Sequence, residues 1–168
     1  MAEPYLFLQK DFDRLNRRIG DVADQITEVG ADMADWAAQG AETWHDNFGY
    51  EEGVRQEDML ARRGEDFEAV RERAEIVTTA SHDRVLVGSR VILENDDGER
   101  RTLIVSSYWV LDRRTPEEIS YAAPLIAPFM GAGTGEQRSV SVPEGEQIWR
   151  VAAIEAVDLV RLQTAGMD

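Results

Sequence analysis

The sequence predicts an α+β protein in which an N-terminal antiparallel coiled-coil hairpin precedes a C-terminal antiparallel-sheet domain. A heptad pattern of apolar residues runs through 12–36. After the small, polar stretch at 78–82, the apolar period changes from that of a helix to that of a strand. Asp97-Gly98 then precedes a new apolar run, which is typical of a β-hairpin turn. The predicted domains are a hairpin over 1–77, a linker over 78–84, a sheet domain over 85–157 and a tail over 158–168.

The first predicted helix carries an unbroken seam of apolar residues spaced alternately three and four apart. This spacing is typical of a coiled coil, and no Pro interrupts the chain between Tyr5 and Ala80. At about 1.5 Å per residue, the helix is expected to be roughly 40 Å long. The seam residues are Phe12, Leu15, Ile19, Val22, Ile26, Val29, Met33 and Trp36.

A second helix is predicted from about Phe48 to Ala74, with a weaker pattern. Gly53 and Gly64 fall where seam residues are expected, so they either permit close backbone approach or loosen the pairing. A short connection favours antiparallel helices, with the bend at 39–50; a pair buried in a larger bundle is the alternative. The expected seam residues are Phe48, Leu60, Phe67, Val70 and Ala74, with Met59 beside them.

The sheet domain is predicted from strands separated by turn residues. The expected elements are a strand over 85–94 with a bend near Gly88, a turn over 95–98, a return strand over 101–111, a charged loop over 112–118, a short strand from Ile119 that breaks at Pro124, a helical turn closed by Gly131, and two strands over 138–142 and 147–157. After Asp158 we expect a partly ordered tail.

The composition is that of an acidic soluble protein. Its 168 residues carry a formal net charge of -15. Affinity for phosphate backbones comes from clustered Lys and Arg, so independent nucleic-acid binding is not expected, and the partner should be basic, metal-bearing or apolar. Solubility alone also explains the charge.

The chain has no Cys, which excludes disulfides and thiolate metal sites. Its first residues lack the features of a signal peptide, and no apolar stretch approaches the ~20 residues of a membrane span. A cytoplasmic location is the expectation, and the excess charge favours a monomer.

The bend contains the residues that point to chemistry. Glu42 and Asp46 are four apart and flank Trp44 and His45, so either one turn of helix or a tight loop would bring both carboxylates together. Two carboxylates alone hold Mg²⁺ poorly, because Mg²⁺ keeps several waters and needs further ligands. Such a pair is useful chiefly when inserted into the metal site of another protein. Two acids at a helix bend are also commonplace, so an ordinary solvated bend stays open.

The other motifs in the sequence give little evidence of function. The glycine-rich stretch 131–135 lacks the Lys and the strand-then-helix context of a nucleotide loop. The chain's two His, His45 and His82, are far apart in sequence, which gives no support to a zinc site or a Ser-His-Asp arrangement.

Four stretches match patterns of one known family. Val85-Leu86-Val87-Gly88-Ser89 matches the strand pattern V-x-F-G-S/A, and the run from Ile119-Ser120 through Ala123-Pro124-Leu125 to Gly131 resembles I-S-x-x-S-P-[IL]-A-x-x-[LI]-[LI]-G. Val142-Pro143-Glu144-Gly145 resembles a T-P-x-G turn, and Asp46-Asn47-Phe48-Gly49-Tyr50 resembles the end of the tip motif G-D-L-S-E-N-A-E-Y. With these stretches the chain resembles the GreA/GreB family, the transcript-cleavage factors of bacterial RNA polymerase.

The resemblance implies a hairpin that enters the polymerase secondary channel, where its tip acids help to hold a second Mg²⁺ and its water. Asp46 falls on the second tip acid, but Thr43 falls on the first, with Glu42 one residue early. The catalytic candidates are therefore Asp46 and Glu42, and the tip contacts are Thr43, Trp44, His45 and Asn47. No intrinsic cofactor is implied, because the polymerase supplies the Mg²⁺.

The resemblance also implies an FKBP-like sheet domain that docks on the polymerase through 122–131. The docking candidates are Ala123, Pro124, Leu125, Ile126, Phe129 and Met130. Three residues depart from the family pattern here: Ala123 replaces a Ser, Ala127 replaces a frequent Arg, and Pro128 stiffens the short helix.

We therefore expect a Gre-like regulatory factor with RNA polymerase core as its partner, acting through the polymerase active site and not as an enzyme itself. Thr43, Trp44 and His45 favour a non-cleaving inhibitor, and a genuine cleavage stimulator is the alternative. A peptidyl-prolyl isomerase is a remote alternative that rests on fold analogy alone. A coiled-coil interaction protein unrelated to polymerase is another.

Overall fold

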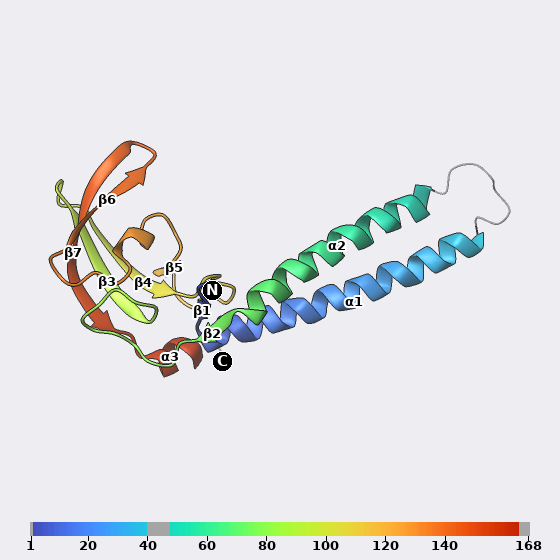
Figure 1. Ribbon diagram of the computed structural model, residues 1–168, viewed down its shortest axis with the longest axis horizontal. Helices are drawn as coiled ribbons and strands as arrows, with labels where there is room; N and C mark the ends of the chain where they lie inside the picture. Colours follow the sequence, from blue (N-terminus) through green and yellow to red (C-terminus); the bar gives the residue numbers. More distant parts are fainter. Residues whose placement is uncertain (1, 40–47, 165–168) are drawn as a thin grey trace. The chain divides into compact units, whose positions relative to one another are not determined.

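The computed structural model describes residues 2–39 and 48–164, which divide into two compact units. One consists of Met1–Arg14 and Ala74–Asp168, and the other is Leu15–Arg73. Helix α1 (Gln9–Gln39) begins in the first unit and continues into the second (Figure 1). The predicted α+β class, a helical hairpin followed by a sheet domain, is confirmed.

The first unit contains a five-stranded sheet with the order β5-β4-β3-β7-β6 (Figure 1). Neighbouring strands are antiparallel except β5, which pairs parallel with β4, so the sheet is mixed and not wholly antiparallel as expected. The strands are β3 (Ser89–Asn95), β4 (Arg100–Ser106), β5 (Glu118–Ser120), β6 (Gln137–Val142) and β7 (Gly145–Ala156).

The turn between β3 and β4 lies where the sequence predicts it, with the Gly98 N–H donating to the Asn95 carbonyl over 3.1 Å. The bend before β3 is also confirmed, because Gly88 has a φ of +91° that favours glycine. Strand β4 ends at Ser106, well before the expected Leu111. Beyond it the Tyr108 N–H donates to the Leu6 carbonyl over 2.9 Å, so the chain leaves the sheet to bond a segment from the N-terminus.

The core of this unit is built around aromatic and branched side chains. Trp149 of β7 and Phe129 of the short 3-10 helix η2 (Ala127–Phe129) are fully buried, together with Leu93 of β3. Burial of so much apolar surface is the main stabilising contribution to such a domain.

Three elements of this unit were not expected. Strand β1 (Tyr5–Phe7) pairs parallel with β2 (Ala74–Ile76). Residues 1–14 and 74–77 belong to the unit with the sheet, whereas the predicted hairpin domain covered 1–77. In place of a partly ordered tail, Leu159–Thr164 forms helix α3, and Leu159 and Leu162 join the core cluster.

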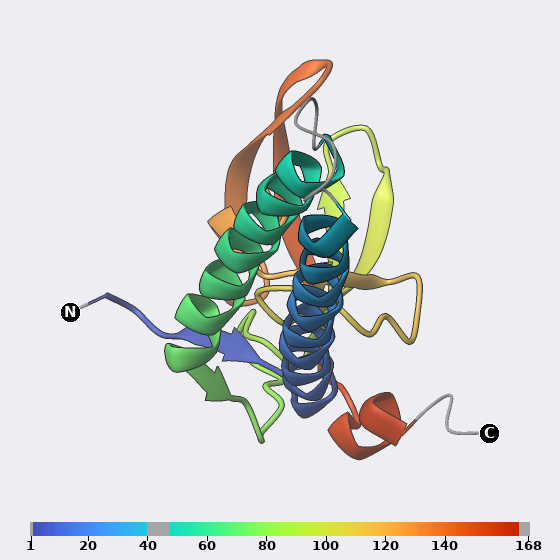
Figure 2. The ribbon, with the colours of Figure 1, turned by 90° about the vertical axis from the view of Figure 1, so that its right-hand side faces the viewer.

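The second unit is an antiparallel hairpin of α1 and α2 (Phe48–Glu72), which lie side by side in Figure 2. The predicted α1 seam is confirmed: from Leu15 to Ala38, every residue that is not exposed belongs to it. Leu15 and Val22 are its buried members, and the others are half-buried.

The seam of α2 differs from the expected one at its start. Phe48 and Met59 are exposed, at 75% and 57%, while Gly53 is buried and Gly49 and Gly64 are half-buried. Leu60 and Val70 are buried as predicted, and Phe67 is half-buried. Gly53 and Gly64 thus lie on the seam as their spacing indicated, and at Gly53 the large side chains Met33 and Trp36 of α1 occupy the space that a side chain would fill.

Candidate functional site

The predicted tip lies outside the described residues. Asp46, Glu42, Thr43, Trp44, His45 and Asn47 all belong to 40–47, so their roles stay predictions. The structure does describe both helix ends that flank this segment, Gln39 of α1 and Phe48 of α2.

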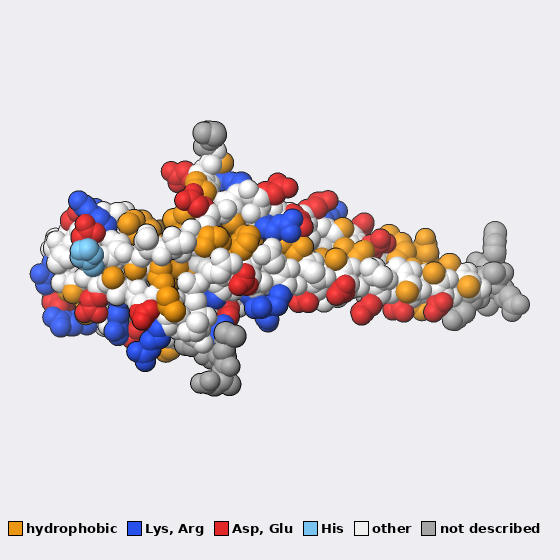
Figure 3. Space-filling model, turned by 90° about the horizontal axis from the view of Figure 1, so that it is seen from below, with side chains coloured by type: hydrophobic (Ala, Val, Ile, Leu, Met, Phe, Trp, Pro, Cys, Tyr) orange, Lys and Arg blue, Asp and Glu red, His pale blue; other side chains and the backbone are white. Residues whose placement is uncertain are grey.

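The part of the hairpin next to this segment is strongly acidic. Between Ile19 and Gln39 the sequence has five carboxylates and no Lys or Arg. Acidic side chains recur along the hairpin in Figure 3. In the first turns of α2, Glu52 accepts hydrogen bonds from Arg55 and Gln56, and the bond from Arg55 chiefly lowers the pKa of Glu52 to about 2. A carboxylate with so low a pKa stays charged at any ordinary pH. The acids of α1 in this stretch are Asp21, Asp24, Glu28, Asp32 and Asp35.

The predicted docking segment is a tight succession of turns. The Ile126 and Ala127 N–H groups both donate to the Ala123 carbonyl, at 3.0 and 2.8 Å. Ile126 and Phe129 are fully buried, so they anchor the segment in the core. Pro124 is exposed, and Ala123, Leu125 and Met130 are half-buried. The outward face is thus formed by Pro124 with the exposed Ala122, Ala127 and Pro128.

A groove lies beside this segment. Tyr121 is one of its walls, and the Tyr121 hydroxyl accepts a hydrogen bond from the Leu6 N–H over 3.2 Å. Burial raises the pKa of the Tyr121 phenol. Tyr5 and Tyr108 stack nearby, with ring centroids 4.3 Å apart. The groove is lined by Glu3, Pro4, Leu6, Tyr121, Ala122, Ala127 and Met130.

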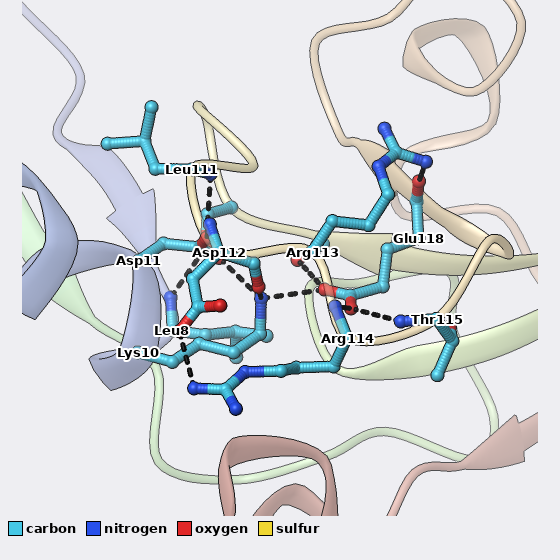
Figure 4. Close-up of polar contacts among 11 residues, drawn as sticks. Leu8, Lys10, Asp11, Leu111, Asp112, Arg113, Arg114, Thr115 and Glu118 are labelled. Atoms are coloured by element: carbon cyan, nitrogen blue, oxygen red, sulfur yellow. Dashed lines mark hydrogen bonds and ion pairs between the residues drawn. The ribbon is translucent and has the colours of Figure 1, made fainter. Parts of the chain in front are cut away.

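A buried ionic cluster, the Lys10 cluster, lies at the first turn of α1 (Figure 4). It consists of Lys10, Asp11 and Glu118, whose side chains are at most 2% exposed. Lys10 Nζ donates to Asp11 Oδ2 at 3.0 Å, Glu118 Oε2 at 2.7 Å and the Asp112 carbonyl at 2.6 Å. An ammonium has three N–H donors, so each one has an acceptor.

The two carboxylates of the Lys10 cluster hold the loop between β4 and β5. Asp11 Oδ1 accepts from the backbone N–H groups of Leu111 and Asp112, each over 2.8 Å, and Glu118 Oε1 accepts from those of Arg114 and Thr115 at 2.6 and 3.1 Å. Ser107 and Ser106 donate to the other oxygens. Because its members are buried and mutually satisfied, the cluster orders this loop and offers no reactive group to solvent. No pattern in the sequence predicted this cluster, and the charged residues directly before the heptad seam were the available signal.

The described part of the chain contains no group of three or more His, Cys, Asp or Glu placed to hold a metal ion. None of the described helices is long and apolar enough to cross a membrane.

Comparison with known proteins identifies the class. Residues 80–156 match the family model described as transcription elongation factor, GreA/GreB, C-terminal. The transcription elongation factor GreA of Treponema pallidum is 32% identical over 114 residues, which cover 65% of this chain and 66% of that protein. The transcription inhibitor protein Gfh1 of Thermus thermophilus is 27% identical over 158 residues, covering 92% of this chain and 99% of the relative.

A solved structure of the transcription factor Gfh1 is 26% identical and covers 93% of this chain and all of that one, with a TM-score of 0.43. The chain belongs to the GreA/GreB family of transcription factors. Its relatives include both elongation factors and an inhibitor.

Proposed function

We propose that this protein is a Gre-like regulator that binds RNA polymerase core, inserts the end of its hairpin into the secondary channel and inhibits elongation without cleaving RNA. The observation that carries the proposal is the alignment over 158 residues with a transcription inhibitor protein, which spans the hairpin as well as the sheet domain. The continuous α1 seam from Leu15 to Trp36 supports it, because a long paired hairpin suits insertion into a narrow channel.

The tip residues support inhibition over cleavage. Thr43 stands where the family pattern has its first acid, which leaves Asp46 alone in register and Glu42 one residue away. The Mg²⁺ is the polymerase's own, and a single well-placed carboxylate completes its ligand set poorly. Trp44 and His45 are bulky enough to obstruct the space that substrate or water would use. The protein is thus a regulator acting at another protein's active site.

The docking part of the proposal uses the segment 122–131. Ile126 and Phe129, being buried, hold the turns in place, while Pro124 and Ala127 present the outward face. The Lys10 cluster orders the loop after β4 and thereby preorganises the same unit, which lowers the entropic cost of binding. We further propose that the protein works as a cytoplasmic monomer and does not bind nucleic acid by itself.

A stalled, backtracked elongation complex tests the choice between inhibitor and stimulator. We expect the wild-type protein to slow nucleotide addition and to leave the 3′ end of the RNA intact. Robust RNA shortening that Asp46→Asn abolishes would overturn the inhibitor proposal and establish the cleavage stimulator. Asp96→Asn is the matched control, since it removes one exposed acid of the β3–β4 turn, outside the hairpin.

Two further measurements test the broader proposal. Failure to bind core RNA polymerase would favour an unrelated coiled-coil interaction protein. Proline-isomerisation activity on a model peptide would favour the isomerase, an alternative that rests on fold analogy alone.

A further inference from the structure

The end of the hairpin next to residues 40–47 has an unusually close helix contact. Trp36, in the last turn of α1, lies over Gly49 in the first turn of α2. A Cβ atom added at Gly49 would lie 3.2 Å from Trp36 Cδ2. A Cβ added at Gly53, one turn further on, would lie 2.5 Å from Met33 Cγ and 3.1 Å from Trp36 Cζ3. Any other residue at position 53 would force Met33 to move, since real Cβ atoms do not approach other atoms so closely.

Among the glycines in the described part of the hairpin, only those at this end have so close a contact. At Gly64 an added Cβ would lie 3.5 Å from Val22 Cγ1, an ordinary van der Waals distance. Glycine destabilises a helix interior, and the first turns of α2 contain two glycines. The helix is therefore intrinsically weaker there, but its backbone can approach α1 closely. Large residues on α1, Met33 and Trp36, face the small ones on α2.

We infer that Trp36, Met33 and Gly53 are positioning residues that set the separation of the two helix ends between which residues 40–47 run. The inference rests on the proposed function insofar as those residues act on the polymerase. Small errors in position are costly in such sites, because a displacement of about 1 Å can reduce an effect by about 100-fold.

The first test measures the helix ends directly and does not involve polymerase. The chain has no Cys, so Cys introduced at the exposed Ala37 and Glu51 can carry a unique pair of spin labels. Gly53→Val is expected to shift or broaden the distance distribution between the labels, and Met33→Ala in the same chain is expected to restore it. Gly64→Val, the matched control, should leave it unchanged. An unchanged distribution in Gly53→Val would overturn the inference whatever the protein does to polymerase.

The second test separates positioning from stability. The effect on elongation is measured against factor concentration, so that the maximal effect at saturation and the half-maximal concentration are obtained separately. Gly53→Val is expected to lower the maximal effect by about tenfold or more, and Met33→Ala is expected to rescue it. Lost stability alone would instead raise the half-maximal concentration, and that result, or an equal loss in Gly64→Val, would contradict a positioning role. If the wild-type protein neither binds nor affects polymerase, the proposed function fails, while the label distances still decide the inference.

Discussion

At the scale of single residues, the Lys10 cluster departs most from what the chain's composition suggests. Of 51 Lys, Arg, Asp and Glu residues, most are solvated, yet Lys10, Asp11 and Glu118 are buried together. Burying charge is costly unless every group finds partners, and here the ammonium has three acceptors and both carboxylates have several donors. These residues join the start of α1 to the loop after β4.

Replacing Lys10 should therefore be strongly destabilising. Lys10→Met removes the cation and leaves Asp11 and Glu118 buried without a countercharge, which typically costs about 3–5 kcal/mol. The free energy of unfolding in urea measures it. Arg100→Met is the control, because the exposed Arg100 pairs with Glu94 at the surface, where ion pairs contribute little. Comparable losses in the two variants would show that burial of the cluster is not what matters.

Glu52 gives a pH-dependent prediction. The hydrogen bond from Arg55 is the largest cause that lowers its pKa from 4.5 to about 2 in the folded hairpin. A depressed folded pKa means that the pair's contribution to stability is present above pH 4.5 and is lost as the pH falls towards 2. Carboxyl-carbon NMR titration should place the Glu52 pKa near 2, and Arg55→Gln should return it towards 4.5. An unchanged Glu52 pKa in that variant would contradict the assignment.

At the scale of elements, α3 shows how local pattern and tertiary packing diverge. The stretch after Asp158 is short, and an isolated helix of six residues is not stable in water. Its order comes from Leu159 and Leu162, which pack into the sheet core, while Val160 between them is 74% exposed. The helix thus forms because the core offers a place for two of its side chains.

Truncating a buried and an exposed side chain of α3 should change the free energy of unfolding by unequal amounts. Leu162→Ala is expected to cost about 2–5 kcal/mol, because it leaves a cavity in the core. Val160→Ala should change the free energy of unfolding by no more than about 0.5 kcal/mol, as is usual at exposed positions. Chemical denaturation measures both. Equal effects would mean that α3 is the loosely held tail that the sequence suggests.

At the scale of the whole molecule, charge distribution matters most for encounter with a partner. The chain has a net charge of -15, and α1 beyond Ile19 contributes carboxylates only. Long-range attraction between such a surface and a basic partner speeds association and is screened by salt. The proposed insertion into a channel would place this stretch closest to the partner.

We accordingly expect association with core RNA polymerase to slow as salt rises, since the screening length falls from about 10 Å at 0.1 M to about 3 Å at 1 M. Neutralising the exposed Asp24, Glu28 and Asp32 together should slow association and flatten the salt dependence, as stopped-flow measurement would report. The control neutralises three exposed acids of the other unit, Asp96, Asp97 and Glu144. A larger effect from the control set would contradict the proposed approach of the hairpin.

The local pattern was enough to identify α1, the β3–β4 turn and the buried Leu60 and Val70 of α2. Each depends on spacing along a few residues or on the conformational preference of one pair, such as Asp97-Gly98. Gly53 lies on the seam as its spacing indicated, but Phe48 is exposed where a seam residue was predicted. Which residues of α2 pack there depends on the size of Met33 and Trp36 across the hairpin, and that size is not visible in the α2 pattern alone. The tip residues from Glu42 to Asn47 remain predictions from sequence.

By itself the sequence determined the class of the protein: a heptad seam with a fixed period must be paired, and alternating strands with Gly turns must form a sheet. Only the tertiary structure decided which segments complete the sheet unit. Strand β1, the Lys10 cluster and α3 are each too short or too polar to be stable alone, and each forms through partners far away in the chain. Long-range contacts of this kind leave no period in the sequence.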